Sequence, residues 1–201
     1  MAVQQEVQKM NVREYVQGDE KGWVRCRVLS FLESSYFDDV YREKETYDNP
    51  SIELVAEHEE TIVGLIDVEL DIAERKICTG DESGGMIWHL AVHPDFQRRG
   101  IATVLLDEAS RRARDQGIAF FEAWTRDDEA TVSWYTNRGF DRRESYLHVY
   151  LTREDAGRVC DCEIDGLSIN SAFAQYVGDD EAQMREQFDR VHDCQQFVRD
   201  I

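Results

Sequence analysis

Residues 86–102 read MIWHLAVHPDFQRRGIA, and this stretch decides the fold. The apolar run over 86–92 predicts a buried strand, and His93-Pro94 after it indicates a turn. The segment that follows has apolar residues at helical spacing and charged residues on the opposite side, which predicts a helix over 98–116. Gly117 is a typical helix stop. One continuous segment therefore predicts a strand, a tight turn and a helix, in that order.

The turn between this strand and this helix has the features of an anion site. The first N–H groups of a helix have no intrahelical partner, and the helix dipole adds positive potential there. Gly100 has no Cβ that would keep a ligand from the backbone. Arg98 and Arg99 add positive charge in a chain whose formal net charge is −19. The sequence therefore predicts that an anionic group, such as a phosphate, binds at this turn.

Three motifs in this region resemble those of the GCN5-related N-acetyltransferases, the GNAT family. Gln97, Gly100 and Ala102 match the family's acyl-CoA pyrophosphate loop, Gln/Arg-x-x-Gly-x-Gly/Ala. Upstream, residues 90–94 (LAVHP) resemble the end of the family's fourth strand, and downstream, residues 134–140 (WYTNRGF) resemble its Tyr-x-x-x-Gly-Phe motif. The specific resemblance covers residues 86–140, and a looser one extends from about residue 10 to about residue 151.

The rest of the chain fits this fold in outline. Apolar patterning predicts a first strand over 11–17, one or two helices over 21–45, a hairpin of strands 52–56 and 61–70, a strand over 118–124, a helix over 129–138 and one or two strands over 140–151. A right-handed crossover makes the strands at 86–92 and 118–124 parallel neighbours. We expect an α/β (α+β) fold: a mixed, largely antiparallel, twisted sheet of six to seven strands, flanked by helices. The resemblance implies that its central parallel pair splays apart to admit acyl-CoA.

The last fifty residues resemble no family that we can name. Asp165-Gly166 between residues 159–164 and 167–176 indicates a hairpin, and apolar residues at helical spacing predict a helix over 181–198. We therefore expect two domains: an acetyltransferase domain over 1–151 and a hairpin-helix extension over 152–201 that packs on it or makes a homodimer.

Composition limits the function classes. The 201 residues include 42 Asp and Glu against 23 Lys and Arg, which disfavours binding to nucleic acid or to an anionic membrane. The chain has no apolar run long enough to cross a bilayer, and its first twelve residues lack the apolar core of a signal peptide, so we expect a cytoplasmic protein. The acidic composition suits a solvated surface at high salt, which makes a halophilic source a hypothesis, and it permits a cationic substrate such as an amine.

The resemblance implies that acetyl-CoA is the co-substrate, and it assigns residues to hold it. These are the backbone of Leu90, Ala91 and Val92 on the strand, and the loop Gln97, Arg98, Arg99, Gly100, Ile101 and Ala102. The family often has an asparagine at the position of Asp128, where it touches the cofactor; an aspartate does not donate as an asparagine does.

Acyl transfer from CoA to an amine also needs a general acid and a general base. Tyr135 is the candidate general acid, because a phenol can protonate a leaving thiolate without being ionised at rest. His89 is the candidate general base. Glu122, Asp67 and Glu69 are alternatives, as is a chain of water molecules with no single base.

The predicted function is transfer of an acetyl group from acetyl-CoA to a primary amine, carried by a small molecule or a protein, by direct attack on the thioester. In this family the acceptor pocket is built by the early helices and the terminal strands, here residues 23–45 and 140–151. These carry Tyr36, Phe37, Asp38, Asp39, Tyr41, Tyr146 and His148. The alternative function is a non-catalytic acyl-CoA-binding sensor or interaction module, which would need the loop but not Tyr135.

The five cysteines do not suggest a disulfide framework, because their number is odd and their spacing is wide. Cys160, Cys162, His192 and Cys194 are types of residue that zinc favours. The simpler interpretation is small buried cysteines and a surface histidine, and we predict no metal site.

Overall fold

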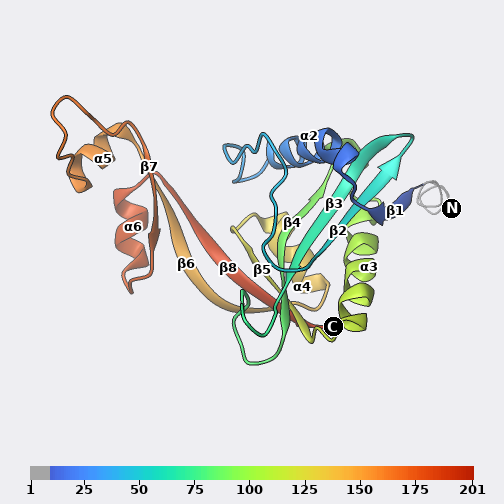
Figure 1. Cartoon of the computed structure of the whole chain (residues 1–201). Helices are drawn as coiled ribbons and strands as arrows, with labels where there is room; N and C mark the ends of the chain where they lie inside the picture. Colours follow the sequence, from blue (N-terminus) through green and yellow to red (C-terminus); the bar gives the residue numbers. More distant parts are fainter. Residues whose placement is uncertain (1–9) are drawn as a thin grey trace.

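The computed structural model describes residues 10–201 and shows a twisted eight-stranded sheet in the order β1-β2-β3-β4-β5-β8-β6-β7 (Figure 1). The strands are β1 (Asn11–Glu14), β2 (Ser51–His58), β3 (Thr61–Leu70), β4 (Gly84–Val92), β5 (Phe120–Thr125), β6 (Asp141–Leu151), β7 (Ala172–Tyr176) and β8 (Arg190–Asp200). All neighbours are antiparallel except β4 and β5, which are parallel. The mixed sheet with one central parallel pair is thus confirmed, and its eight strands exceed the predicted six to seven.

Helices cover both faces of the sheet. They are η1 (Gln17–Asp19), α2 (Glu20–Phe31), η2 (Pro94–Phe96), α3 (Ile101–Asp115), α4 (Glu129–Asn137), α5 (Arg153–Val159) and α6 (Glu181–Gln187). On one face α2 packs through Trp23 and Cys26 against Val55 and Leu65. The larger core lies on the other face, between the sheet and helices α3 and α4.

The amphipathic pattern of α3 explains which side it buries. Leu105, Leu106, Ala109 and Ala113 recur at helical spacing, and each is completely buried against the sheet. Burial of a leucine side chain stabilises a fold by roughly 1.5–3 kcal/mol. This core fixes the start of α3, and with it the loop over 97–100, beside the end of β4.

Residues 32–45 are not helical, although their apolar residues are spaced as in a helix. After α2 ends at Phe31, the chain forms turns up to Asp38 and an irregular segment up to Pro50. Tertiary contacts explain the difference: Tyr36 and the backbone of Ser35 are bonded to Arg126, at the end of β5, rather than to a neighbouring helical turn.

The predictions for the C-terminal region were wrong in their elements. The hairpin at Asp165-Gly166 does not form; α5 and the irregular residues 160–171 take its place, and β7 pairs with β6. The helix predicted over 181–198 ends at Gln187, and residues 190–200 are strand β8. Without β8, the edge of β5 that faces away from β4 would have unpaired backbone N–H and C=O groups. β8 supplies hydrogen-bond partners for both β5 and β6.

The long strands β6 and β8 extend beyond the body of the sheet and carry β7, α5 and α6 at their far end, as an arm (Figure 1). This arm has a small core of its own around Leu147, Val149 and Phe188. The division of the chain at residue 151 stays a prediction; β8, which comes after that division, lies inside the sheet.

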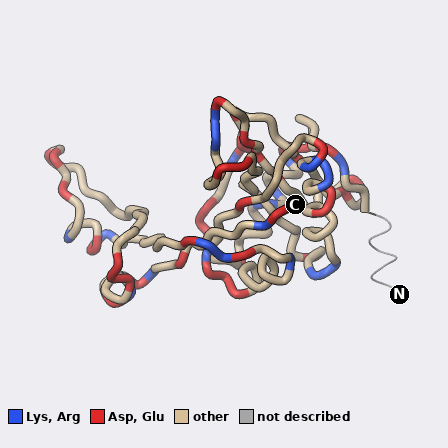
Figure 2. The backbone as a smooth tube through the Cα atoms, turned by 90° about the horizontal axis from the view of Figure 1, so that it is seen from below, with Lys and Arg blue, Asp and Glu red and all other residues tan. Residues whose placement is uncertain are grey.

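Acidic residues are spread along the backbone of both the body and the arm (Figure 2). None of the helices in residues 10–201 is long and apolar enough to span a bilayer.

Candidate active site

The site begins where the two parallel strands part. Pairing between β4 and β5 runs from Gly84↔Phe120 to Ile87↔Ala123 and ends there. A bulge in β4 accompanies this point, because Val68 of β3 pairs with Ile87 and Asp67 pairs with His89, which leaves Trp88 as the extra residue. Beyond it, β4 continues alongside β3 only. The edge of β4 over residues 88–92 thus faces a gap and not another strand.

The loop after β4 leads into α3 with a left-handed backbone at two positions. Gly100 is the N-cap of α3 at φ +84°, and Arg98 has φ +59°. A Cβ at Gly100 would meet no atom within 4 Å, so this side of the loop is open. Gln97 donates from Nε2 to the carbonyl of Val92 at 3.2 Å, which ties the loop to the end of β4. The open loop and the N-terminus of α3 thus lie where the sequence predicts an anion site.

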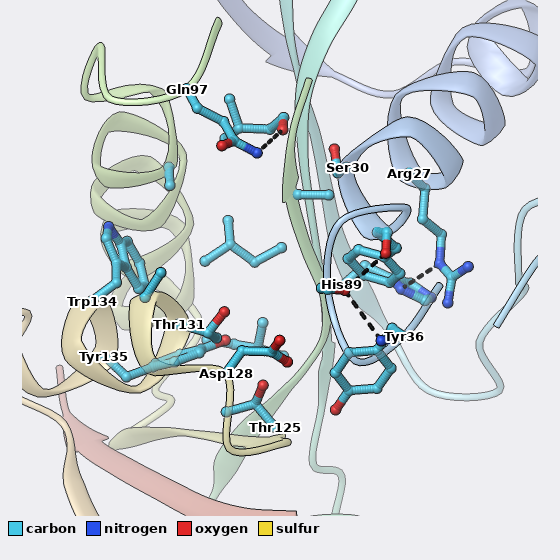
Figure 3. A pocket seen from close by; sticks show the side chains of 18 of the residues that line it. Arg27, Ser30, Tyr36, His89, Gln97, Thr125, Asp128, Thr131, Trp134 and Tyr135 are labelled. Carbon is cyan, nitrogen blue, oxygen red and sulfur yellow. Dashed lines mark hydrogen bonds between the residues drawn. The ribbon is translucent and has the colours of Figure 1, made fainter. Parts of the chain in front are cut away.

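A cavity of about 510 Å³ connects this loop with the gap (Figure 3). All but one of the residues that the sequence predicts to hold the cofactor line this cavity. They are Leu90, Ala91, Val92, Gln97, Arg98, Gly100, Ile101, Ala102 and Asp128. Arg99 is absent from the lining: its guanidinium donates to the carbonyl of Asp95 and lies over the ring of Phe96.

Tyr135 and His89 both line this cavity but lie on opposite faces of the sheet (Figure 3). Tyr135 belongs to the core on the side of α3 and α4. His89 is on the side of α2, where its ring packs edge-on against Trp23 at 5.0 Å. One cavity reaches both residues because the sheet is open between β4 and β5.

The ring of Tyr135 is held by other aromatic rings. It stacks on Phe197 of β8 at 5.2 Å and meets Phe140 and Trp134 edge-on. Burial, with a smaller contribution from the nearby Tyr36 phenol, raises the pKa of Tyr135. Its phenol is therefore protonated at neutral pH, as a general acid requires.

His89 has a partner at each ring nitrogen. Nδ1 accepts a hydrogen bond from Arg27 Nε at 3.3 Å, and Nε2 lies 2.6 Å from Glu45 Oε2. Since Arg27 can only donate, the ring proton in this arrangement is on Nε2 and is shared with Glu45. The lone pair that a general base needs is thus covered by Arg27.

Arg27 and Glu45 are site residues that the sequence analysis missed. Arg27 is almost fully buried in α2; its guanidinium bonds to Asp39 and lies 3.8 Å from the centre of the Tyr41 ring. The hydrogen bond from His89 is the largest cause that holds the pKa of Glu45 below its ordinary value. Arg27 could have been noticed from the sequence, because an arginine on the apolar face of a predicted helix is unusual. No local sequence pattern marks Glu45.

Asp128 stands at the N-cap position of α4, but its side chain does not cap that helix. Its carboxylate accepts from the backbone N–H of Ser35 at 2.9 Å and from the Ser35 hydroxyl. Arg126 and Arg190 donate to the carbonyl of the same Ser35. The segment around Ser35 is therefore bonded to the end of β5, to the start of α4 and to the start of β8 in the arm, and it forms one wall of the cavity.

The alternative bases lie elsewhere. Asp67 is bonded to Lys44 and Tyr47, Glu69 to Asn49 and Trp88, and Glu122 to Thr79 and Trp124. None of these three carboxylates lines the cavity.

The possible zinc ligands are not brought together. His192 bonds to Asp127, Cys194 is buried, and Cys162 is exposed on the arm. In residues 10–201 no group of three or more His, Cys, Asp and Glu side chains has the arrangement of a metal site.

Comparison with known proteins now decides the family. The model of the acetyltransferase (GNAT) family matches residues 20–140, more than half of the chain.

The chain belongs to the GNAT family of acetyltransferases.

An acetyltransferase from Sodalis glossinidius is 27% identical over 126 residues, which cover 62% of this chain and 80% of that protein. A GNAT acetyltransferase from Streptococcus pneumoniae has a TM-score of 0.61 at 15% identity, covering 96% of this chain and 99% of that one. An N-acetyltransferase from Thermoplasma acidophilum, solved with coenzyme A, has a TM-score of 0.53 at 17% identity, covering 67% and 91%. These solved structures show the shared GNAT fold.

Family membership makes the chain an N-acetyltransferase with acetyl-CoA as its co-substrate. The strand-loop-helix that the sequence singled out is the part of the GNAT fold that faces the open cavity.

Proposed function

We propose that this GNAT enzyme acetylates a primary amine by direct attack through the gap between β4 and β5. The observation that carries the proposal is that one cavity is lined by His89 on the α2 face and by Tyr135 on the α3 face. The thioester lies at the gap, the amine arrives from the side of His89, and the leaving sulfur is on the side of Tyr135.

The chain's own groups fit acetyl-CoA. The open left-handed Gly100, the N–H groups at the start of α3 and the positive charge of Arg98 suit a pyrophosphate. The backbone of Leu90, Ala91 and Val92, on the edge of β4 that faces the gap, suits the pantetheine arm and offers N–H donors for the thioester carbonyl. Asp128, whose carboxylate is bonded to Ser35, would act by holding the wall rather than by donating to the cofactor.

The chemistry balances with two proton transfers. The amine nitrogen forms a bond to the thioester carbon while the bond from that carbon to sulfur breaks. The amine gives up one proton on the α2 face, and the departing thiolate takes one from the Tyr135 phenol. Burial raises the pKa of Tyr135, and the same water-poor surroundings raise the pKa of the departing thiol. Because both pKa values rise, the phenol can still give its proton to the thiolate.

The proton from the amine has two routes. His89 Nδ1 accepts it once Arg27 turns away, and Glu45 at Nε2 then stabilises the imidazolium. In the other route a water molecule bound to the exposed part of Glu45 carries the proton to solvent. The first route makes His89 the base, and the second makes it the residue that positions Glu45.

The test is Tyr135→Phe, which keeps the aromatic stack and removes only the hydroxyl. We expect kcat for thiol release with a reactive amine to fall by about tenfold or more, equivalent to ~1.4 kcal/mol of barrier, with acetyl-CoA binding unchanged by calorimetry. Tyr176→Phe on the arm is the matched control and should keep full activity. A kcat for Tyr135→Phe within twofold of the wild type would remove Tyr135 from the mechanism. Acetyl-CoA binding without thiol release from any amine would favour the sensor function instead.

A cytoplasmic location, and a homodimer made through the arm, stay predictions from the sequence.

A further inference from the structure

Two tryptophans stand at the point where the sheet opens. Trp88 and Trp124 are the residues directly after Ile87↔Ala123, the last pair between β4 and β5. Both line the cavity. Trp88 is 48% exposed although it lies inside a strand next to the core, so its indole is presented to the cavity mouth rather than packed away.

Each indole is fixed by a buried carboxylate behind it. Trp88 Nε1 donates to Glu69 Oε2 at 2.8 Å, and Trp124 Nε1 donates to Glu122 Oε1 at 2.8 Å. Glu69 and Glu122 are themselves almost fully buried, and within residues 10–201 neither forms an ion pair with an arginine or a lysine. Each indole is therefore held by a hydrogen bond to a buried carboxyl group.

The remaining charges on this face also favour a cation. The guanidinium of Arg27 is paired with Asp39 and is already covered by the ring of Tyr41. On this face of the cavity this leaves the carboxylate of Glu45, whose side chain is 40% exposed and which is bonded to His89 rather than to an arginine or a lysine. Indole faces attract cations, and nearby carboxylates strengthen that attraction.

We propose that Trp88, Trp124 and Glu45 form an acceptor subsite that selects amines carrying a second positive charge, such as linear diamines. The inference rests on the proposed acetyl transfer and adds the substrate class to it. The reacting nitrogen must be neutral when it attacks, so the second ammonium supplies the binding. It lies against the indoles, while the reacting amine reaches the gap beside His89.

The experiment compares two acceptors with the same carbon chain, diaminobutane and butylamine. The wild type should have a kcat/KM about tenfold higher for the diamine. Trp88→Leu and Trp124→Leu should each reduce this preference to threefold or less, mainly through KM for the diamine. Phe173→Leu, which removes an exposed aromatic side chain of β7 outside the cavity, is the control and should keep the preference.

A second measurement separates the subsite from the reaction and from folding. Diaminobutane is titrated into the CoA-bound protein and followed by tryptophan fluorescence, and calorimetry with acetyl-CoA verifies that each variant is folded. Saturable binding that weakens in the two leucine variants supports the subsite even if no amine is turned over, in which case the proposed reaction fails alone. Equal kcat/KM for both acceptors in the wild type, or a preference unchanged in both variants, would overturn the inference and leave the acetyl transfer standing.

Discussion

The two ends of α3 offer a matched test of the anion loop. Gly100 precedes the helix at φ +84° and Gly117 follows it at φ +78°; a Cβ at either position would meet no atom within 4 Å. Alanine at both positions therefore suffers the same backbone strain and no clash. The left-handed conformation costs an L-residue about 1–2 kcal/mol, so Gly100→Ala and Gly117→Ala should lower the free energy of unfolding by similar amounts.

Only one of the two glycines lies on the cavity. Gly100 lines it and is in the loop proposed to hold the pyrophosphate, whereas Gly117 is at the far end of a fifteen-residue helix. A methyl group at Gly100 would take the space of a phosphate oxygen against the helix N-terminus. We expect acetyl-CoA affinity to fall at least tenfold in Gly100→Ala, about 1.4 kcal/mol, and less than twofold in Gly117→Ala.

Two assays decide this prediction. Thermal unfolding measures the loss of stability that both variants should share. For a chain of this size it corresponds to a fall in Tm of about 2–8 °C in each variant. Isothermal calorimetry with acetyl-CoA measures the difference between them. Equal affinities in the two variants would refute the assignment of the loop, whatever their stability.

Two further predictions concern the charges that support the site. Burial, with a smaller contribution from Arg126, lowers the pKa of His148 to about 4, so the folded protein binds this proton less readily than the unfolded chain does. The free energy of unfolding should therefore fall by up to about 3 kcal/mol as the pH drops from about 6.5 towards 4. In urea unfolding, His148→Gln should lose less stability over this pH range than the wild type. Lys44 is buried and bonded to the buried Asp67 and to Glu53, so Lys44→Met should destabilise the fold by about 3–5 kcal/mol in urea unfolding, and Lys44→Met with Asp67→Asn should recover part of this; full stability of the single variant would show that the buried pair is unimportant.

The central part of the fold could be predicted because local and long-range signals agree there. The apolar run before Pro94, the amphipathic period of α3 and the glycine stops at Gly117 and Gly139 all follow from the geometry of single elements. These elements also carry the family motifs, and both the loop after β4 and Tyr135 line the cavity.

The parts that could not be predicted depend on distant partners. Residues 190–200 are a strand because β5 and β6 both need a neighbour, and no pattern within that segment contains this information. The segment around Ser35 takes its shape from Arg126 and Arg190, which are far away in the sequence. Glu45 lies in the same irregular region, so its place beside His89 is a product of the tertiary fold alone.

The measurement that tests the account most directly is a crystal structure with CoA and a diamine bound together. We expect the pyrophosphate at residues 97–102, the sulfur on the side of Tyr135 and the amine on the side of His89, with the gap between β4 and β5 separating them. A diamine bound on the same face of β4 as the CoA sulfur, or a pyrophosphate away from this loop, would contradict it.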